Sequence, residues 1–463
     1  MCGKISSAIA DNKVYFSYAT TETFINKVII TTDMDSLINA IRSLNPWWAN
    51  KPFQREGMIE RTIQKEILES LKLRQIKDVI GVRRSGKTTL LHLVIDNLIQ
   101  HKIPPSKIFF LSFDEINLST ASFDEIDRAI AQIEIGPEYL FLDEAQEKAN
   151  WERWVKQLYD SRKFKKIFVS GSNASLLSKD VGKLLSGRHI TTAIYPFSFK
   201  EFLIANGWKN FSRNYLLSEK NKILHYLNLY LKNGGFPETV AKDDISVNRI
   251  LSNVYNDIIS RDIATRHSIE REKIDLLAKY LFTNITKEYS YNNLAKNIGI
   301  NIETVERYLN YLEESFLLFI LNLFSYKLKV QYKQNKKIYA IDNGLRNSIA
   351  FRFSEDLGQL YENAVYIELK RSGKEIYYWK RTGEVDFLIK EGLKIKELLQ
   401  VCKNVSDKKI KAREIKGLME ASKEFKVRKA KVITEDYHNK EKINRVDIEF
   451  IPLWLWLLLE ESN

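Results

Sequence analysis

GVRRSGKT, residues 81–88, matches the pattern Gly-x-x-x-x-Gly-Lys-Ser/Thr in full. An apolar, β-rich run at residues 77–82 leads into it, and residues 88–100 continue as an amphipathic helix. The glycines let backbone N–H groups approach a phosphate chain, and the helix points the positive end of its dipole at the same place. Because the motif lies between a strand and a helix, as its mechanism requires, the stretch predicts a nucleotide-binding loop.

The fixed residues of this loop have separate roles. Lys87 places a point charge on the β- and γ-phosphates, and Thr88 offers its hydroxyl to Mg²⁺. ATP and Mg²⁺ are therefore the predicted cofactors. We expect eight residues to contact the nucleotide: Gly81, Arg83, Arg84, Ser85, Gly86, Lys87, Thr88 and Thr89.

A nucleotide-binding loop of this kind also needs an acid from another part of the chain to hold the water shell of the Mg²⁺. An apolar strand downstream ends in Asp143 and Glu144. Asp143 is predicted to coordinate the metal. Glu144 is predicted to polarise the attacking water as a general base. The following strand ends in small polar residues, where Asn173 is the candidate sensor of the γ-phosphate and Ser172 the alternative.

An arginine could stabilise the charge that develops on the transferred phosphate. Arg188, in LSGRH, is the first candidate. It could act on its own chain or on a neighbouring subunit of a homo-oligomer. Arg261 and Arg266, in SRDIATRH, compete for the same role, and the sequence leaves the choice open.

Composition narrows the class of protein. A net charge of +13 over 463 residues favours polyanionic partners, chiefly nucleic acid. The two cysteines suggest free thiols in a reducing compartment. The most apolar run, residues 450–459, is shorter than the roughly 20 residues that cross a bilayer. The first residues lack the apolar stretch of a signal peptide, so a cytoplasmic protein without membrane attachment is expected.

Several further stretches resemble one known family. FLDEAQ, SGSNASLLS, YPFSFKEFL and GGFPETV follow the loop, and ISRDIATR, YENAVYIEL and EVDFLI lie farther along. With the loop they resemble the archaeal-type ATPases, AAA-related P-loop proteins with a poorly understood C-terminal part. The resemblance covers about residues 45–460. It implies an α/β fold with a parallel P-loop sheet, a helical lid, a winged helix-turn-helix and a C-terminal nuclease-like domain of the PD-(D/E)xK type.

The order of predicted elements agrees with that architecture. Apolar strands alternate with helices up to residue 197, which is typical of a parallel sheet covered on both faces. Mainly helical segments follow, and the last third of the chain returns to mixed α/β. The expected division is an N-terminal extension at 1–58, the ATPase core at 59–197, a lid at 198–285, the winged helix at 286–345 and the nuclease-like domain at 346–463.

A helix-turn-helix is expected at residues 292–299, with residues 303–316 as its recognition helix. Lysines that suit phosphate contacts follow on a predicted hairpin: Lys327, Lys329, Lys333, Lys336 and Lys337. Base readout is opposed by acids on the recognition helix: Glu303, Glu306, Glu313 and Glu314. We therefore expect non-specific or structure-specific DNA binding, with a pure packing role as the alternative.

The resemblance also implies a divalent-metal centre in the last domain, formed by an acid on one strand and Glu-x-Lys on the next. Asp386 takes the place of the first acid, and Glu362 on a preceding helix could assist it. Gln400 and Cys402 share one strand face at the Glu and Lys positions. Gln400 lacks the charge that a hard cation requires, and Cys402 supplies no cation. We predict a degenerate site that does not cut nucleic acid.

The predicted function is an Mg²⁺-dependent ATPase that couples nucleotide binding or hydrolysis to conformational change, acting on DNA. A nucleotide-switched scaffold that recognises a protein partner is the first alternative. An ATP-dependent nuclease is the second. Salt dependence separates the first two, because a DNA-acting ATPase should bind duplex with a steep salt slope and a scaffold should not.

Overall fold

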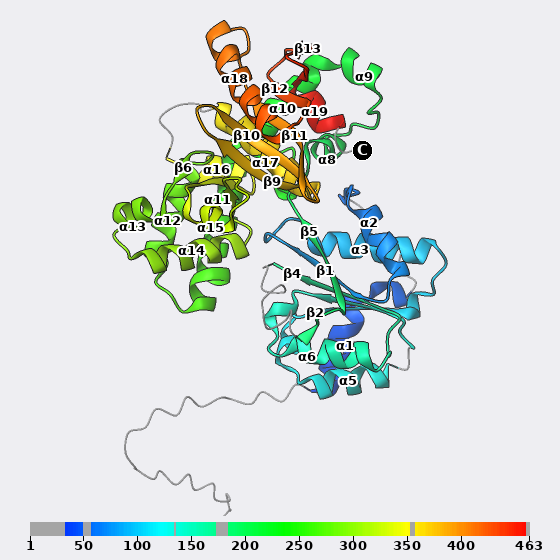
Figure 1. The fold of residues 1–463 in the computed structure, drawn as a ribbon. Coiled ribbons are helices and arrows are strands. Elements are labelled where there is room, and N and C mark those ends of the chain that lie inside the picture. The colour runs from blue at the N-terminus through cyan, green and yellow to red at the C-terminus, as the bar shows by residue number, and fades with distance from the viewer. Residues whose placement is uncertain (1–32, 50–56, 134–135, 173–183, 352–356, 460–463) are drawn as a thin grey trace, which may run out of the picture.

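The structure is a computed structural model that describes residues 33–49, 57–133, 136–172, 184–351 and 357–459. Figure 1 shows the elements up to β5 (His189–Ile194) in one lobe and the elements from α8 (Phe199–Ala205) onward in another. Within these residues, no helix combines the length and the apolar character needed to cross a membrane.

A five-stranded parallel sheet forms the first lobe, in the order β2-β3-β4-β1-β5. Its strands are β1 (Ile76–Gly81), β2 (Ile108–Ser112), β3 (Tyr139–Asp143), β4 (Lys166–Gly171) and β5 (His189–Ile194). The three central strands β3, β4 and β1 are buried along their whole length, as expected for parallel strands covered on both faces. The parallel α/β sheet predicted from the sequence is thus confirmed.

Helices cover both faces of this sheet (Figure 1). Successive residues of β1 point to opposite faces, so Val79 belongs to one apolar cluster and Ile80 to another. The cluster of Val79 includes α2 (Gln64–Glu69) and α3 (Lys87–Gln100). Within the first lobe, the cluster of Ile80 includes residues of α1 (Met34–Leu44), α5 (Phe123–Gln132) and α6 (Trp151–Asp160).

The edge strand β2 is covered by residues that precede the nucleotide-binding loop. The Asn45 side chain accepts a hydrogen bond from Phe110 N at 2.7 Å and donates one to Phe110 O at 2.8 Å. The indole N–H groups of Trp47 and Trp48 both donate to Ile108 O, at 3.2 and 2.9 Å. The residues before position 50 that the structure describes therefore take the place of a neighbouring strand.

Helices follow β5 and pack largely on the second lobe. They are α8 (Phe199–Ala205), α9 (Arg213–Ser218), α10 (Lys220–Asn233), α11 (Asp244–Asp257), a π-helical turn η7 (Ile258–Thr265) and α12 (Arg271–Thr283). α10 contacts the later helices α16 (Asn343–Ile349), α17 (Leu357–Arg371) and α19 (Leu453–Leu459). The predicted lid is thus in close contact with the C-terminal part of the chain.

A helix-turn-helix and a three-stranded sheet form the next unit. Its elements are β6 (Glu288–Tyr289), α13 (Tyr291–Ile298), α14 (Ile302–Glu314), β7 (Leu318–Asn322), α15 (Leu328–Lys333) and β8 (Lys336–Ala340). The sheet order is β6-β8-β7. The prediction that Lys336 and Lys337 contact phosphates from an exposed hairpin is wrong, because both side chains are buried in β8 at 7% and 4% exposure.

The last unit is a mixed six-stranded sheet in the order β13-β14-β12-β11-β10-β9. Its strands are β9 (Glu375–Lys380), β10 (Glu384–Glu391), β11 (Lys394–Val401), β12 (Lys429–Thr434), β13 (Asn439–Ile443) and β14 (Val446–Pro452), with α18 (Lys408–Phe425) between β11 and β12. The apolar run predicted to be buried at residues 450–459 forms the end of β14 and α19. Leu453 to Leu458 are all at most 2% exposed.

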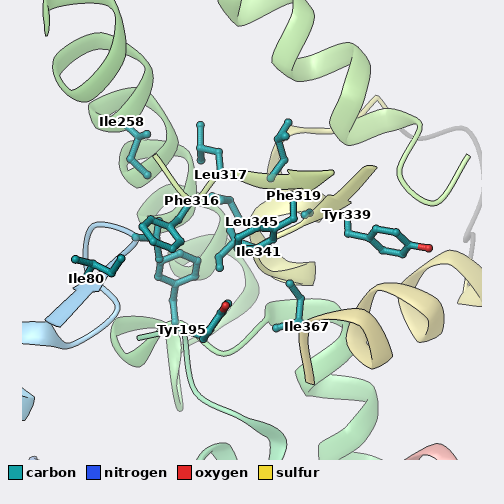
Figure 2. Packing of buried hydrophobic residues seen from close by; sticks show 14 of the residues in the cluster. Ile80, Tyr195, Ile258, Phe316, Leu317, Phe319, Tyr339, Ile341, Leu345 and Ile367 are labelled. Atoms are coloured by element: carbon teal, nitrogen blue, oxygen red, sulfur yellow. The ribbon is translucent and has the colours of Figure 1, made fainter. Parts of the chain in front are cut away.

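One apolar cluster connects the two lobes. Figure 2 shows Ile80 of β1 and Tyr195, which follows β5, near Ile258 of η7 and Phe316 and Phe319 of the helix-turn-helix unit. The strand that carries the nucleotide-binding loop is therefore in the same packed cluster as the units beyond it.

Candidate nucleotide site

The loop between β1 and α3 has the backbone that its glycines predict. Gly81 ends β1 with φ of 155°, and an added Cβ would lie 2.1 Å from Ile194 O, so no other residue fits. Arg84 (φ 63°) and Gly86 (φ 93°) are left-handed on either side of Ser85. Alternating backbone handedness of this kind forms anion-binding concavities. The Ser85 hydroxyl is buried and has no hydrogen-bond partner among the described residues.

Lys87 is the first residue of α3 and is 4% exposed. Its ammonium donates to the carbonyl oxygens of Gly81 at 3.1 Å and Val82 at 3.2 Å, and Glu144 Oε1 lies 3.9 Å away. Burial lowers the pKa of Lys87, and the Glu144 and Asp143 carboxylates oppose this shift only in part. A buried ammonium with mainly neutral partners gains strongly from a phosphate anion.

Thr88 and Asp143 meet at the carboxyl edge of the sheet. The Thr88 hydroxyl donates to Asp143 Oδ2 at 2.8 Å, and the Ser170 hydroxyl donates to the other carboxylate oxygen. Burial and the neighbouring Glu144 raise the pKa of Asp143. A hydroxyl beside a carboxylate is an oxygen donor set that suits Mg²⁺. The residues present therefore fit the predicted metal and nucleotide.

Glu144 occupies a strained position at the end of β3. It has φ of 48°, and its Oε2 accepts a hydrogen bond from Gln146 Nε2 at 2.5 Å. The same amide also donates to the Ser172 hydroxyl at 3.1 Å. Gln146 thus connects the predicted base with the alternative γ-phosphate sensor, a role that sequence reasoning missed. The first-choice sensor, Asn173, lies outside the described residues.

The three candidate arginines lie in different places. Arg188 precedes β5 and lies at the amino-terminal ends of the parallel strands, whereas Lys87 lies at their carboxyl ends. The Arg188 guanidinium pairs with Asp160 Oδ1 at 3.0 Å. Arg188 therefore lies at the other end of the strands from the loop of its own chain, and its role as an arginine finger stays a prediction. Arg261 belongs to η7. Its charge lowers the pKa of the Asp114 carboxyl, against the larger effect of burial, which raises that pKa. Arg266 lies near Glu314 of α14.

Two loop arginines reach the helices beyond the sheet. Arg83 donates through Nε and Nη2 to both oxygens of Asp262 in η7, at 3.2 and 3.0 Å. Arg84 Nη1 pairs with Glu238 Oε2 at 2.8 Å, and its Nη2 lies 3.8 Å from Asp257. The acids lie in or next to the quoted motifs GGFPETV and SRDIATR, but their partners could not be read from the sequence.

A buried arginine supports the loop from the other side. Arg61, at 6% exposure, donates to Ser85 O at 2.9 Å and to Tyr195 O at 2.7 Å, and its Nε lies 3.0 Å from Glu201 Oε1. Thr89 is half-buried in the first turn of α3. The loop is therefore held between the preceding segment and α8.

Comparison with known proteins gives a family for this arrangement. Residues 73–203 match a family described as "AAA domain". An uncharacterized protein of Methanocaldococcus jannaschii is 36% identical over 86% of this chain and 91% of its own length. The chain belongs to the archaeal-type AAA P-loop ATPases. An uncharacterized protein of Haemophilus influenzae is 29% identical to this AAA ATPase over 87% of the chain and 98% of its own length.

The rest of the ATPase matches families without an assigned function. Residues 224–356 match "Domain of unknown function (DUF8612)" and residues 357–456 match "Domain of unknown function (DUF4143)". Among solved structures, Aeropyrum pernix ORC1 in complex with DNA is 11% identical with a TM-score of 0.29, over 65% of this chain and 92% of that chain. Saccharomyces cerevisiae Hsp104 is 15% identical with a TM-score of 0.31, over 59% and 52%. Likenesses this weak carry no argument about function.

The predicted nuclease-like residues of the ATPase are only partly brought together. Glu362 of α17 and Asp386 of β10 lie on either side of the Lys337 ammonium, each 3.3 Å from it. Gln400 lies beside Asp386 but bonds its backbone, since Gln400 Oε1 accepts from Asp386 N at 3.1 Å. Cys402 is 5% exposed in an apolar cluster, where burial raises the pKa of its thiol to about 11.

Proposed function

We propose that this AAA ATPase hydrolyses ATP with Mg²⁺ and transmits the nucleotide state to the helices beyond its sheet. The observation that carries the proposal is the Thr88–Asp143 hydrogen bond of 2.8 Å beside the buried Lys87. It places a hydroxyl, a carboxylate and an ammonium at the start of one helix, whose dipole favours anions. ATP would supply the scissile phosphoric anhydride and Mg²⁺ would neutralise its charge.

The protein residues then divide the work. Lys87 exchanges the carbonyl oxygens of Gly81 and Val82 for phosphate oxygens. Thr88 and Asp143 would hold the metal. Glu144 receives a proton from the attacking water at Oε1 or Oε2, and Gln146 orients that carboxylate.

The transmission step uses the ion pairs of Arg83 and Arg84. A guanidinium binds a carboxylate or a phosphate with the same donor geometry, so both arginines can exchange their acids for nucleotide oxygens. Asp262 would then be released from Arg83, which frees η7 to move. π-Helical turns are frequent at functional sites, and η7 lies in the apolar cluster that also holds Ile80 (Figure 2).

We further propose that the ATPase acts on DNA. The net charge of +13 supports this, as do the exposed side chains of Lys327, Lys329 and Lys333 around α15. Glu303 and Glu306 are exposed on α14, which opposes base readout and supports backbone binding. The rival proposal is a protein partner, for which the acidic surface of α14 is the supporting observation.

The test is the steady-state ATPase rate with and without duplex and branched DNA. Lys87→Ala and Glu144→Gln should abolish turnover, whereas Glu147→Gln, in the same loop but exposed, should retain it. Stimulation of the ATPase rate by DNA should disappear at high salt. A plot of the logarithm of the DNA-binding constant against the logarithm of the salt concentration should become less steep when the three lysines around α15 are replaced by Ala, by up to about 0.9 per lost phosphate contact. Slow turnover that no DNA changes would overturn the DNA proposal and favour the protein partner. Turnover retained in both site variants would overturn the proposed hydrolysis.

A further inference from the structure

Lys337 stands where the resemblance implies a divalent metal. Its side chain is 5% exposed, and its ammonium lies 2.7 Å from Glu384 Oε1 and 3.3 Å from the carboxylates of Glu362 and Asp386. The lysine comes from β8 of the helix-turn-helix unit. The three acids come from α17 and β10 of the last unit. The cation and its ligands therefore belong to different parts of the chain.

The remaining donors do not complete a metal site. Gln400, at the position of the second strand acid, uses its oxygen on Asp386 N and donates its amide to Glu414 Oε2 at 2.7 Å. Asp386 Oδ2 accepts a hydrogen bond from Val401 N at 2.9 Å. Over the part of the chain that the structure describes, no group of His, Cys, Asp and Glu is arranged to hold a metal ion. With the Lys337 ammonium among its carboxylates, the site thus does not fit the divalent metal that the fold resemblance implies.

The ammonium is instead fully integrated into the carboxylate cluster. Its three carboxylate partners lie at 2.7, 3.3 and 3.3 Å, and the Asp386 and Glu362 side chains are themselves only 8% and 15% exposed. Glu362 has one more partner. Its Oε1 also accepts a hydrogen bond from the Tyr339 hydroxyl at 2.7 Å.

The contacts around Lys337 join the two sheets. Its ammonium lies 5.6 Å from the ring centroid of Tyr378 in β9. The Tyr378 hydroxyl donates to Asn335 O at 2.5 Å, and Phe324 N donates to Tyr378 O at 2.8 Å. A bridge between Leu323 and Tyr378 continues β7 alongside β9.

We propose that Lys337 is a built-in cation that replaces the divalent metal of the nuclease-like centre and fastens the helix-turn-helix unit to the C-terminal sheet. This assignment is independent of nucleotide hydrolysis. The centre then becomes a permanent interface between the two units. Because the units are fixed to each other, they would move together when η7 moves.

Mn²⁺ binding, measured by electron paramagnetic resonance on the full chain, tests this assignment. Lys337→Met should gain one Mn²⁺ per chain over the wild type, and the added Asp386→Asn change should remove that gain. Lys336→Met is the matched control, because Lys336 is the neighbouring buried lysine of β8 and its ammonium lies over Tyr291, 4.8 Å from the ring centroid. It should gain no ion.

The wild type alone also decides the question, should Lys337→Met fail to fold. Asp386→Asn in the wild-type background should leave the number of bound Mn²⁺ ions unchanged, and the wild type should not nick supercoiled DNA in Mn²⁺. Loss of one ion in Asp386→Asn, or cleavage that depends on Asp386, would overturn the proposal and make Lys337 part of a working nuclease. A folded Lys337→Met protein that gains no ion would overturn it as well.

Discussion

Two buried lysines mark the two candidate centres, and their surroundings are opposite. Lys87 bonds two backbone carbonyls and has one carboxylate at 3.9 Å, and burial lowers its pKa. Lys337 has three carboxylates within 3.3 Å, which hold its pKa well above the usual value. The first ammonium lacks a full counter-charge and the second has more than one.

The difference teaches how to separate a binding site from a structural one. The burial of Lys87 is compensated only in part, so a phosphate would stabilise its ammonium. Lys337 gains nothing from an added anion. Burial of a lysine does not distinguish the two cases, but the number and charge of its partners do.

The largest expected effect is on stability and concerns Lys337. Replacing it by Ala leaves three carboxylates of which two are well buried, and breaking a buried ion pair in this way costs about 3–5 kcal/mol. Lys87→Ala should leave the free protein near wild-type stability, because it removes a charge that burial already disfavours. Thermal unfolding of the three proteins without nucleotide checks this. A larger loss for Lys87→Ala would reverse the comparison.

The next effect is on chemistry at the Lys87 site. Glu144→Gln should lower the ATPase rate by roughly 100-fold or more, since it removes the proposed general base. Nucleotide affinity should be kept, because the amide preserves the shape and Lys87 remains. Binding of a fluorescent ATP analogue and the hydrolysis rate are measured together. Loss of both would place Glu144 in binding and not in proton transfer.

A smaller effect is expected where the loop meets the lid. Asp262→Asn removes the buried, bidentate partner of Arg83, which should cost about 1–2 kcal/mol of stability. It should also raise nucleotide affinity, because the acid no longer competes with phosphate for the same guanidinium. Glu238→Gln is the matched comparison, since its pair with Arg84 is about half exposed and such pairs contribute less than about 1 kcal/mol, so its loss of stability and its gain in affinity should both be smaller. Equal effects in both variants would contradict the proposed transmission through Asp262.

The smallest effect lies outside both centres. The hydrogen bond with Asp78 raises the pKa of His189 above its usual 6.5, against a smaller effect of burial. The folded protein therefore holds this proton more tightly than the unfolded chain. The contribution is complete below pH 6.5 and is lost as pH rises through the folded pKa. Between pH 6 and 8, the melting temperature of the wild type should therefore fall slightly more than the melting temperature of the His189→Gln variant. Parallel curves would show that the pair adds nothing.

The residues of the candidate nucleotide site could be placed together from the sequence because the patterns that carry them are local. Lys87 and Thr88 lie in one motif, Asp143 ends a recognisable strand, and parallel strands bring their carboxyl ends to one edge. The parallel sheet followed from the same alternation of apolar strands and helices. Gln146 could not be assigned, because its contact with Glu144 depends on a left-handed residue that the sequence does not reveal.

The contacts between units could not be predicted, because charge partners far apart in sequence leave no local pattern. Arg83 and Asp262 are 179 positions apart, and Lys337 and Asp386 are 49 apart. The lysines between positions 327 and 337 predict a basic hairpin that includes Lys337. The structure buries it, since β8 is the middle strand of its sheet and three acids of the last unit surround the Lys337 ammonium.

The residues that cover the free edge of β2 determine where the protein can be truncated. The AAA match starts at residue 73, and a fragment cut there would lack Asn45, Trp47 and Trp48. The free N–H and C=O groups of Ile108–Ser112 would then be a template for other strands, as uncovered sheet edges are in aggregation and domain swapping. A soluble ATPase fragment should therefore begin before residue 33, and precipitation of shorter fragments would reflect the missing edge cover and not an unstable core.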